Sequence, residues 1–331
     1  MKLGLLVVLI TAVYAAQFPS YRAAGSIQIG GTGGWDYLTA DATNRRLYVS
    51  HSGQVEVVDI ESGKPVGQIP GMTGVHGIAI ANELHAGFIS DGRANEVVEF
   101  SLADLAVKKK IKAGTNPDGI VYDSISKRVF AFNGRSQDAT VIDAVNGTEV
   151  GTVKLDGKPE FPVSDGAGSV FVNIEDKSEL LKINSKTLAV EAKWPLAPCE
   201  SPSGLAMDKS NRRLFSVCDN KLMAVTDADS GKVVATPAIG EGPDAAAYDS
   251  ETHLAFSSNG KSGTMTVIHA DGRDKYSVVA TVETGKGART MTLDAKTHKI
   301  YLSTASFESG PGKRPAILPN TFRLLVLAPT F

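Results

Sequence analysis

A four-residue phrase recurs seven times along this chain of 331 residues, and its spacing constrains the fold more than any other feature. The copies are Trp35-Asp36-Tyr37-Leu38, Val75-His76-Gly77-Ile78, Pro117-Asp118-Gly119-Ile120, Pro159-Glu160-Phe161-Pro162, Pro202-Ser203-Gly204-Leu205, Pro243-Asp244-Ala245-Ala246 and Ala288-Arg289-Thr290-Met291. Neighbouring copies begin 40 to 45 residues apart. Short strands and turns repeated at this period are typical of a β-propeller, in which each repeat forms one blade. The sequence therefore predicts an all-β fold with seven blades.

The third repeat shows what one blade should contain. Four apolar or alternating segments, at residues 119–122, 128–132, 139–143 and 149–155, are separated by polar turns. The pair Asn146-Gly147 before the last segment is a strong hairpin signal. Each repeat is therefore predicted to form four antiparallel strands, the outermost with one dry face and one wet face.

The two ends of the chain complement each other. The seventh repeat has predicted strands near residues 290–293, 299–303 and 321–327, after which the chain stops without an outer strand. Residues 22–31 match the outer-strand pattern but have no blade of their own. We expect this N-terminal segment to complete the seventh blade, because closing the ring in this way removes free sheet edges.

Residues 1–16 have the pattern of a secretory signal peptide. Lys2 precedes an apolar run at 3–13, and the small residues Ala15 and Ala16 follow it. The run is too short to cross a bilayer, so no membrane span is expected in the mature chain. We expect cleavage near Ala15 or Ala16, a periplasmic or secreted location, and a single propeller domain from residue 17 to 331.

The charge balance argues against a nucleic-acid partner. The formal net charge is −2, with 34 basic and 36 acidic residues, and no basic footprint stands out. The run Lys108-Lys109-Lys110 falls on a predicted outermost strand, where lysines discourage pairing between sheet edges. We expect a monomer whose partner is a small molecule or a protein.

The second member of the phrase is polar in every copy. These residues are Asp36, His76, Asp118, Glu160, Ser203, Asp244 and Arg289. The topology of a blade places all seven beside the central channel, on the face that usually carries propeller ligands. A hydrated channel rim would explain them, and so would a binding site at the channel mouth. Among them Glu160, Asp118, Asp244 and His76 are candidate metal ligands, and their oxygens favour Ca²⁺ or Mg²⁺ over a transition metal.

The loops between the second and third strands of each blade should lie on the same face. They supply the further candidate ligand residues His51, Asn133, Arg135, Asn173, Glu175 and Asn259. The longest of these loops, residues 305–320, is rich in Gly and Pro; a disordered loop is favoured over a lid.

The two cysteines, Cys199 and Cys218, also lie on this face, in one repeat. An exported protein can keep a disulfide, so we predict that they pair. A thiolate metal site together with His76 is the less favoured alternative.

The strands resemble those of the YVTN-repeat, YncE-like β-propellers, a family of exported bacterial proteins. The matching second strands are at residues 47–50, 129–132, 170–173 and 300–303, and the Val-Ile-Asp type of third strand occurs at 57–59 and 141–143. No repeat contains the literal Tyr-Val-Thr-Asn tetrad. The resemblance implies the seven-bladed fold but little about activity, because such propellers serve many functions.

Three functions are compatible with these features. The first is a non-enzymatic exported propeller that binds a small ligand, a metal ion or a protein on the loop face. The second is a metal-dependent hydrolase similar to propeller lactonases, with Glu160, Asn133, Asn173, Asn259 and Asp244 around a divalent cation. The third is a redox partner, by analogy with dehydrogenase-type propellers. No Gly-x-Ser-x-Gly, His-Glu-x-x-His or Cys-x-x-Cys-His motif is present.

Overall fold

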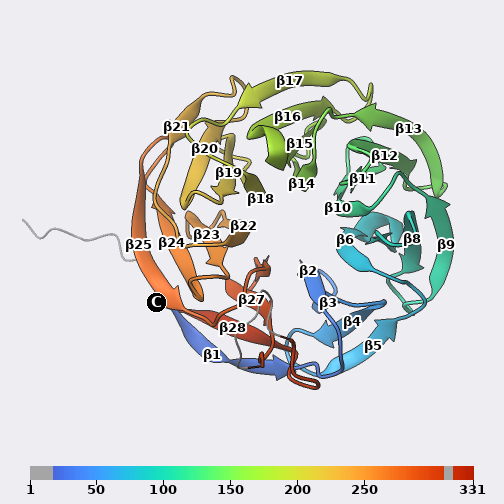
Figure 1. The fold of residues 1–331 in the computed structure, drawn as a ribbon, viewed down its shortest axis with the longest axis horizontal. Coiled ribbons are helices and arrows are strands. Elements are labelled where there is room, and N and C mark those ends of the chain that lie inside the picture. The colour runs from blue at the N-terminus through green and yellow to red at the C-terminus, as the bar shows by residue number, and fades with distance from the viewer. Residues whose placement is uncertain (1–17, 309–315) are drawn as a thin grey trace, which may run out of the picture.

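Seven four-stranded antiparallel sheets are arranged in a ring around a central channel (Figure 1). The computed structural model describes residues 18–308 and 316–331, so the predicted signal peptide at 1–16 lies outside the described residues. The predicted all-β, seven-bladed fold is confirmed. Within the described ranges, no helix is long and apolar enough to cross a membrane.

Each of the first six blades runs from an inner strand to an outer strand in chain order. The strands of blades one to three are β2 (Trp35–Asp41), β3 (Arg46–His51), β4 (Gln54–Asp59), β5 (Pro65–Ile69), β6 (Val75–Ala81), β7 (Ala86–Asp91), β8 (Glu96–Ser101), β9 (Val107–Lys112), β10 (Pro117–Asp123), β11 (Arg128–Asn133), β12 (Asp138–Asp143) and β13 (Thr148–Lys154). Those of blades four to six are β14 (Pro159–Ser164), β15 (Ser169–Ile174), β16 (Glu179–Asn184), β17 (Val190–Pro195), β18 (Pro202–Asp208), β19 (Arg213–Cys218), β20 (Leu222–Asp227), β21 (Val233–Ala235), β22 (Pro243–Asp249), β23 (Leu254–Asn259), β24 (Thr264–Ala270) and β25 (Tyr276–Glu283). Two 3₁₀ turns, η1 (Asn82–Leu84) and η2 (Glu175–Lys177), interrupt this pattern.

The seventh blade closes the ring as predicted. It consists of β26 (Met291–Asp294), β27 (Lys299–Thr304), β28 (Arg323–Thr330) and the N-terminal strand β1 (Ser20–Gln28) as its outer strand. β1 and β28 pair antiparallel from Ser20 opposite Thr330 to Gln28 opposite Arg323. The two ends of the described chain therefore lie in one sheet, and the seventh blade has four strands like the other six.

The core lies between neighbouring blades rather than at the centre of the ring. Phe130 and Phe132 of β11, for example, share a buried cluster with Val170 and Val172 of β15. Second strands such as β7, β19 and β23 are buried along their whole length, because each has a sheet neighbour on both edges and a blade on both faces. Burial of each large side chain stabilises the fold by roughly 1.5–3 kcal/mol. The centre of the ring is thus free to carry polar residues.

A buried Asp recurs at the end of the inner strand in six of the seven blades. In six blades this Asp ends or follows the inner strand and accepts backbone N–H groups of the next turn, as Asp41 does from Thr43 and Asn44. Such Asx turns fix the direction of the hairpin. The second blade has Ala81 instead, and there the chain forms η1.

Two further expectations concern the surface. Lys108-Lys109-Lys110 lies on the exposed outer strand β9, as predicted. The insertion 305–320 is only partly described: Phe307 and Ile317 form an isolated β-bridge, and residues 309–315 lie outside the described residues. The described parts of this segment are joined by that bridge and are otherwise irregular.

Candidate functional site

A local irregularity of the inner strands directs the second member of each phrase into the channel. In blades one to six, the pairing of the first and second strands shifts register between the first and fourth members of the phrase, for example between Trp35 and Leu38 and between Pro117 and Ile120. A bulge of this kind takes residues out of the ladder and re-aims their side chains. The second and third members fall inside it. In blade seven, Arg289 lies just before β26.

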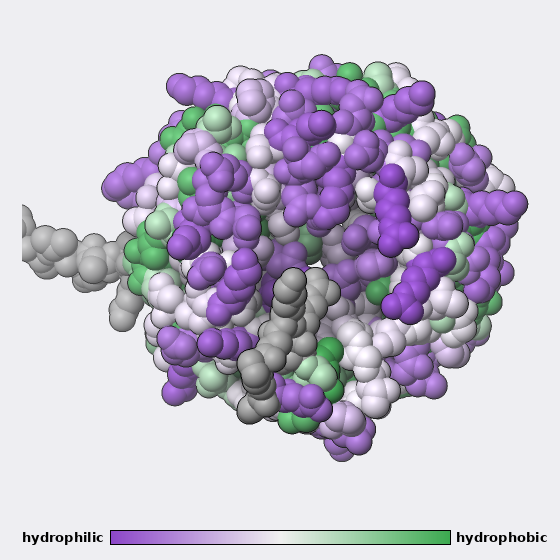
Figure 2. All heavy atoms as spheres, viewed as in Figure 1, coloured by the Kyte–Doolittle hydropathy of each residue, from purple (hydrophilic) through white to green (hydrophobic). Residues whose placement is uncertain are grey.

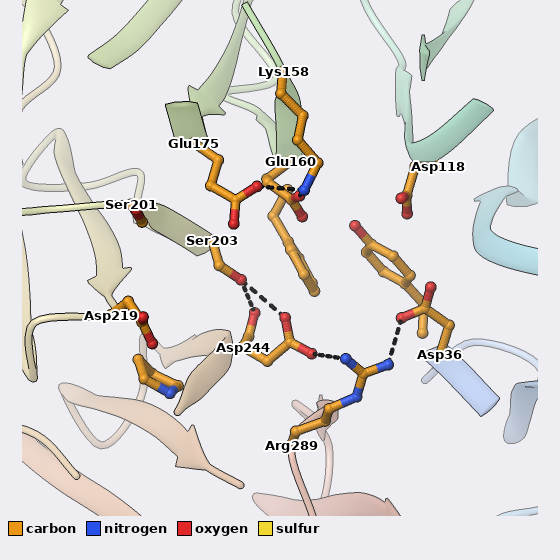
Figure 3. A pocket seen from close by; sticks show the side chains of 13 residues that line it. Asp36, Asp118, Lys158, Glu160, Glu175, Ser201, Ser203, Asp219, Asp244 and Arg289 are labelled. Atoms are coloured by element: carbon orange, nitrogen blue, oxygen red, sulfur yellow. Dashed lines mark hydrogen bonds and ion pairs between the residues drawn. The ribbon is translucent and has the colours of Figure 1, made fainter. Parts of the chain in front are cut away.

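These side chains surround a cavity of about 430 Å³ at the channel mouth, which we call the cup. Its volume is within the range of small-molecule sites. The lining residues are Asp36, Tyr37, Asp118, Lys158, Glu160, Phe161, Glu175, Ser201, Ser203, Asp219, Pro243, Asp244 and Arg289 (Figure 3). On the face shown in Figure 2, hydrophilic residues gather around the centre of the ring. Six of the seven second members of the phrase line the cup, as the sequence predicted. The remaining one, His76, contacts two of them.

Three blades meet at His76. Its Nδ1 lies 2.6 Å from a carboxylate oxygen of Asp36 and 3.7 Å from one of Asp118. Burial disfavours the charged imidazole, but the hydrogen bond to Asp36 and the charges of Asp118 and Asp36 outweigh it, so the pKa of His76 is raised. His76 therefore lies between two carboxylates that favour its protonated form.

Arg289 extends the same chain of contacts to the other side. Its guanidinium lies 3.8 Å from Asp36 and 3.2 Å from Asp244. Ser203 donates from its hydroxyl to the Asp244 carboxylate at 2.9 Å. Burial opposes the charge on Arg289, yet Asp244 and Asp36 raise its pKa. Six second members thus form one continuous network from Asp118 to Ser203.

Glu160, the seventh, belongs to a separate group. The Lys158 ammonium lies 2.7 Å from Glu160 and also pairs with Glu175 of η2 (Figure 3). Burial penalises the charge on Lys158, and the two carboxylates more than compensate, so its pKa is raised. Lys158 was not among the residues predicted from the sequence, although it stands two positions before Glu160.

Three carboxylates of the cup, those of Asp118, Glu160 and Asp244, have raised pKa values. Burial, followed by the charge of Asp118, raises the pKa of Glu160 to about 8. Burial and the charge of Asp36 raise the pKa of Asp118 to about 6. Burial also raises the pKa of Asp244, against the attraction of Arg289. An additional positive charge in the cup would relieve all three.

Hydrogen bonds from neighbouring blades hold the backbone of the network. Ser90 donates to the Asp118 carbonyl at 2.5 Å, Thr290 to the Asp36 carbonyl at 2.7 Å, and Asn173 to the Ser203 carbonyl at 3.0 Å. Ser203 and Ser258 do the same for Asp244 and Arg289. Five of the seven second members are therefore anchored by a residue that precedes them in the ring, which pre-organises the cup.

An aromatic pair from blades one and four joins opposite sides of the cup. Tyr37 and Phe161 occupy the third member of the phrase in blades one and four, and their ring centroids are 4.3 Å apart. In the other five copies the third member is Gly, Ala or Thr. The Tyr37 hydroxyl is buried and has no hydrogen-bond partner within residues 18–308 and 316–331. Burial, followed by the charges of Asp118 and Glu160, holds the pKa of Tyr37 well above its usual value.

Three predicted ligand residues do not reach the cup. The amides of Asn133, Asn173 and Asn259 are fully buried and bond to protein groups, such as Thr140 for Asn133 and Thr266 for Asn259. The carboxylate and asparagine set of the hydrolase hypothesis is therefore not assembled around the channel. These residues end strands β11 and β23, or lie next to the end of β15, and hold loops together.

His51 and Arg135 also lie away from the cup. His51 is buried, with Nδ1 3.3 Å from Glu56 and its ring against Phe322. It lines a separate pocket beneath the glycine-rich segment 30–34. Arg135 is exposed on the loop after β11. Of the second-loop candidates, only Glu175 lines the cup.

Two of the four predicted metal ligands, His76 and Asp118, lie close together. Among the described residues, the group of potential ligand atoms that lies within 4.8 Å is Asp36, His76 and Asp118. Glu160 and Asp244 belong to the Lys158 and Arg289 contacts instead. His76 Nδ1 in this group already takes part in a hydrogen bond with Asp36, so a metal there would have to displace that proton.

The predicted disulfide between Cys199 and Cys218 is confirmed, with the two Cα atoms 5.5 Å apart. This excludes the alternative of a thiolate metal site. The bridge ties together the two segments that bring Ser201 and Asp219 to the cup. A backbone hydrogen bond from Asp219 to Glu200 reinforces the junction.

Comparisons with known proteins show the fold and not the family. No family model matches the chain, and no curated protein matches it. Solved structures of similar fold include hydrazine synthase of Kuenenia stuttgartiensis, which is 15% identical with a TM-score of 0.72 over 82% of this chain and 92% of that chain. U3-55K is 9% identical with a TM-score of 0.78, covering 92% of this chain and 98% of that one. The WD40 repeats of RRP9 are 10% identical with a TM-score of 0.79, covering 94% and 99%. At these identities the likeness shows the β-propeller fold alone.

Proposed function

We propose that this protein is an exported, YVTN-repeat type β-propeller that binds a small positively charged ligand in the cup. The observation that carries the proposal is the charge of the lining. Six carboxylates, from Asp36, Asp118, Glu160, Glu175, Asp219 and Asp244, outnumber the basic groups that contact them, which are Lys158, Arg289 and the adjacent His76. Buried carboxylates that lack counter-ions hold protons instead, and a cation can take the place of those protons.

The family and the location rest on the sequence. The strand motifs of the YVTN repeat and the leader-like pattern at 1–16 support an exported protein, and the disulfide fits an oxidising compartment. N-terminal sequencing of the protein from its native host should begin just after Ala15 or Ala16. Recovery of the intact N-terminus from the cytoplasm would contradict export.

A thermal-shift screen tests the binding function. We expect Ca²⁺, Mg²⁺ or small organic ammonium ions to raise the melting temperature, whereas neutral sugars and organic acids should not. Binding to the folded state stabilises in proportion to the logarithm of ligand concentration over Kd. The Glu160→Gln variant should lose most of the shift. Glu241→Gln, an exposed acid in the loop before β22, is the matched control and should keep it. If anions raise the melting temperature and cations do not, the proposal is wrong.

A further inference from the structure

The cup is rich in hydrogen-bond acceptors and poor in free donors. Six carboxylates and the hydroxyls of Ser201, Ser203 and Tyr37 line it. The two cationic side chains are already engaged, since Lys158 bridges Glu160 and Glu175 while Arg289 bridges Asp36 and Asp244. A ligand that matches this lining must bring several donors as well as positive charge.

The protein's own side chains show which type of cation suits the carboxylates. In both groups the carboxylates pair with nitrogen cations, with nitrogen to oxygen distances of 2.7 Å for Lys158 to Glu160 and 3.2 Å for Arg289 to Asp244. Lys158 also donates a hydrogen bond to Glu175, whereas Asp244 Oδ2 is left without a hydrogen-bond donor among the described residues. A metal ion needs several oxygens converging on one point, and the one such group in the described chain is closed by the bond between His76 and Asp36. The lining therefore favours an ammonium ion over a metal.

The unpartnered Tyr37 hydroxyl points to a further polar group on the ligand. Its oxygen is buried at the cup and has no partner in the described part of the chain. A buried hydroxyl without a partner costs about 1–3 kcal/mol, so a ligand that pairs with it gains that energy on binding. A hydroxyl on the ligand can both donate and accept, and thus matches Tyr37 as well as the carboxylates.

We infer that the ligand of the cup is a small hydroxylated primary ammonium ion, an aminopolyol or amino sugar, whose ammonium group binds between Glu160 and Glu175 where Lys158 now lies. This inference rests on the proposed function. The volume of about 430 Å³ would hold about fourteen water-sized groups at about 30 Å³ each, which suits a molecule of this size.

Isothermal titration calorimetry at pH 8 tests the inference with three probes. These are 1-amino-1-deoxysorbitol, sorbitol of the same shape but without the charge, and CaCl₂. We expect the aminopolyol to bind and sorbitol to bind at least tenfold more weakly. Binding of Ca²⁺ alone would overturn the inference and leave the proposed function standing. Absence of binding by any cation would overturn both.

Two substitutions should change the affinity for the aminopolyol in opposite directions. Glu160→Gln removes a charged acceptor and should weaken the aminopolyol by roughly tenfold, the effect of losing a charge-assisted hydrogen bond. Lys158→Met removes the side chain that competes for Glu160 and Glu175, and it should strengthen binding of the aminopolyol. Lys177→Gln makes the same loss of charge nearby, at an exposed position of η2, and should change little. If Lys158→Met weakens binding, the ammonium does not bind where Lys158 lies.

Discussion

Tyr37 in the first blade packs against Phe161 in the fourth, with ring centroids 4.3 Å apart and ring planes inclined by 30°. The two residues are the large members of a position that is otherwise small. Together they join opposite sides of the cup, where the Tyr37 hydroxyl has no partner in residues 18–308 and 316–331.

Tyr37→Phe should separate stability from binding. The variant keeps the ring contact with Phe161 and deletes a buried hydroxyl without a described partner, so the free energy of unfolding should stay the same or rise by about 1 kcal/mol. Affinity for 1-amino-1-deoxysorbitol should fall. Urea unfolding and calorimetry measure the two effects. A clear loss of stability would show that the hydroxyl is satisfied in the free protein.

Asn173→Ala tests the anchoring of the network. The Asn173 amide donates to the carbonyls of Ser203 and Gly204 and accepts from Ser216, all within the core. Its removal leaves buried groups unsatisfied and should lower the free energy of unfolding by about 1–3 kcal/mol. Asn220→Ala, which deletes two solvent-exposed bonds, one donated to the Pro198 carbonyl and one accepted from the Glu200 N–H, should cost less. Equal losses in the two variants would refute the anchoring role.

The disulfide should contribute measurably to stability. Cys199 and Cys218 are 19 residues apart, and closing a loop of this size stabilises by roughly 3 kcal/mol in the chain-entropy model. The double variant C199A/C218A should unfold at lower urea concentration than the oxidised protein. Dithiothreitol should destabilise the wild type and leave the double variant unaffected. A wild type insensitive to complete reduction would contradict this contribution.

Glu160 should make stability depend on pH. Its pKa is about 8 in the folded protein and near 4.5 when unfolded, so the folded state holds a proton that the unfolded state releases between these values. Stability should therefore fall as the pH rises from about 5 to 8, by at most about 1.4 kcal/mol per unit. Glu160→Gln should flatten this slope in urea unfolding at several pH values. A slope of equal steepness in both proteins would assign the effect to other groups.

The sequence predicted the scaffold well because the scaffold repeats. The period fixed seven blades, the missing outer strand identified the closing role of residues 22–31, and the placement of Cys199 and Cys218 in one repeat indicated the disulfide. The second members of the phrase, such as Asp36 and Arg289, were identified because topology alone places them at the channel.

Other parts of the site depend on contacts that no repeat reveals. Asn133 and Asn259 end their strands like ligand residues, but each turns inward to bond within its own blade. Tyr37 and Phe161 meet across the ring, which only the closed propeller shows. The third member of the phrase did carry a signal, since large residues appear there in two copies alone.

The central claim is that the cup exchanges protons for a small cation. Calorimetry of 1-amino-1-deoxysorbitol at pH 7, in two buffers of different ionisation enthalpy, counts the protons released on binding. The account predicts that the wild type releases protons on binding, because the added positive charge in the cup favours ionised Glu160, and that Glu160→Gln releases fewer. Binding heats that are identical in the two buffers, or no binding by this or any other small cation, would contradict it.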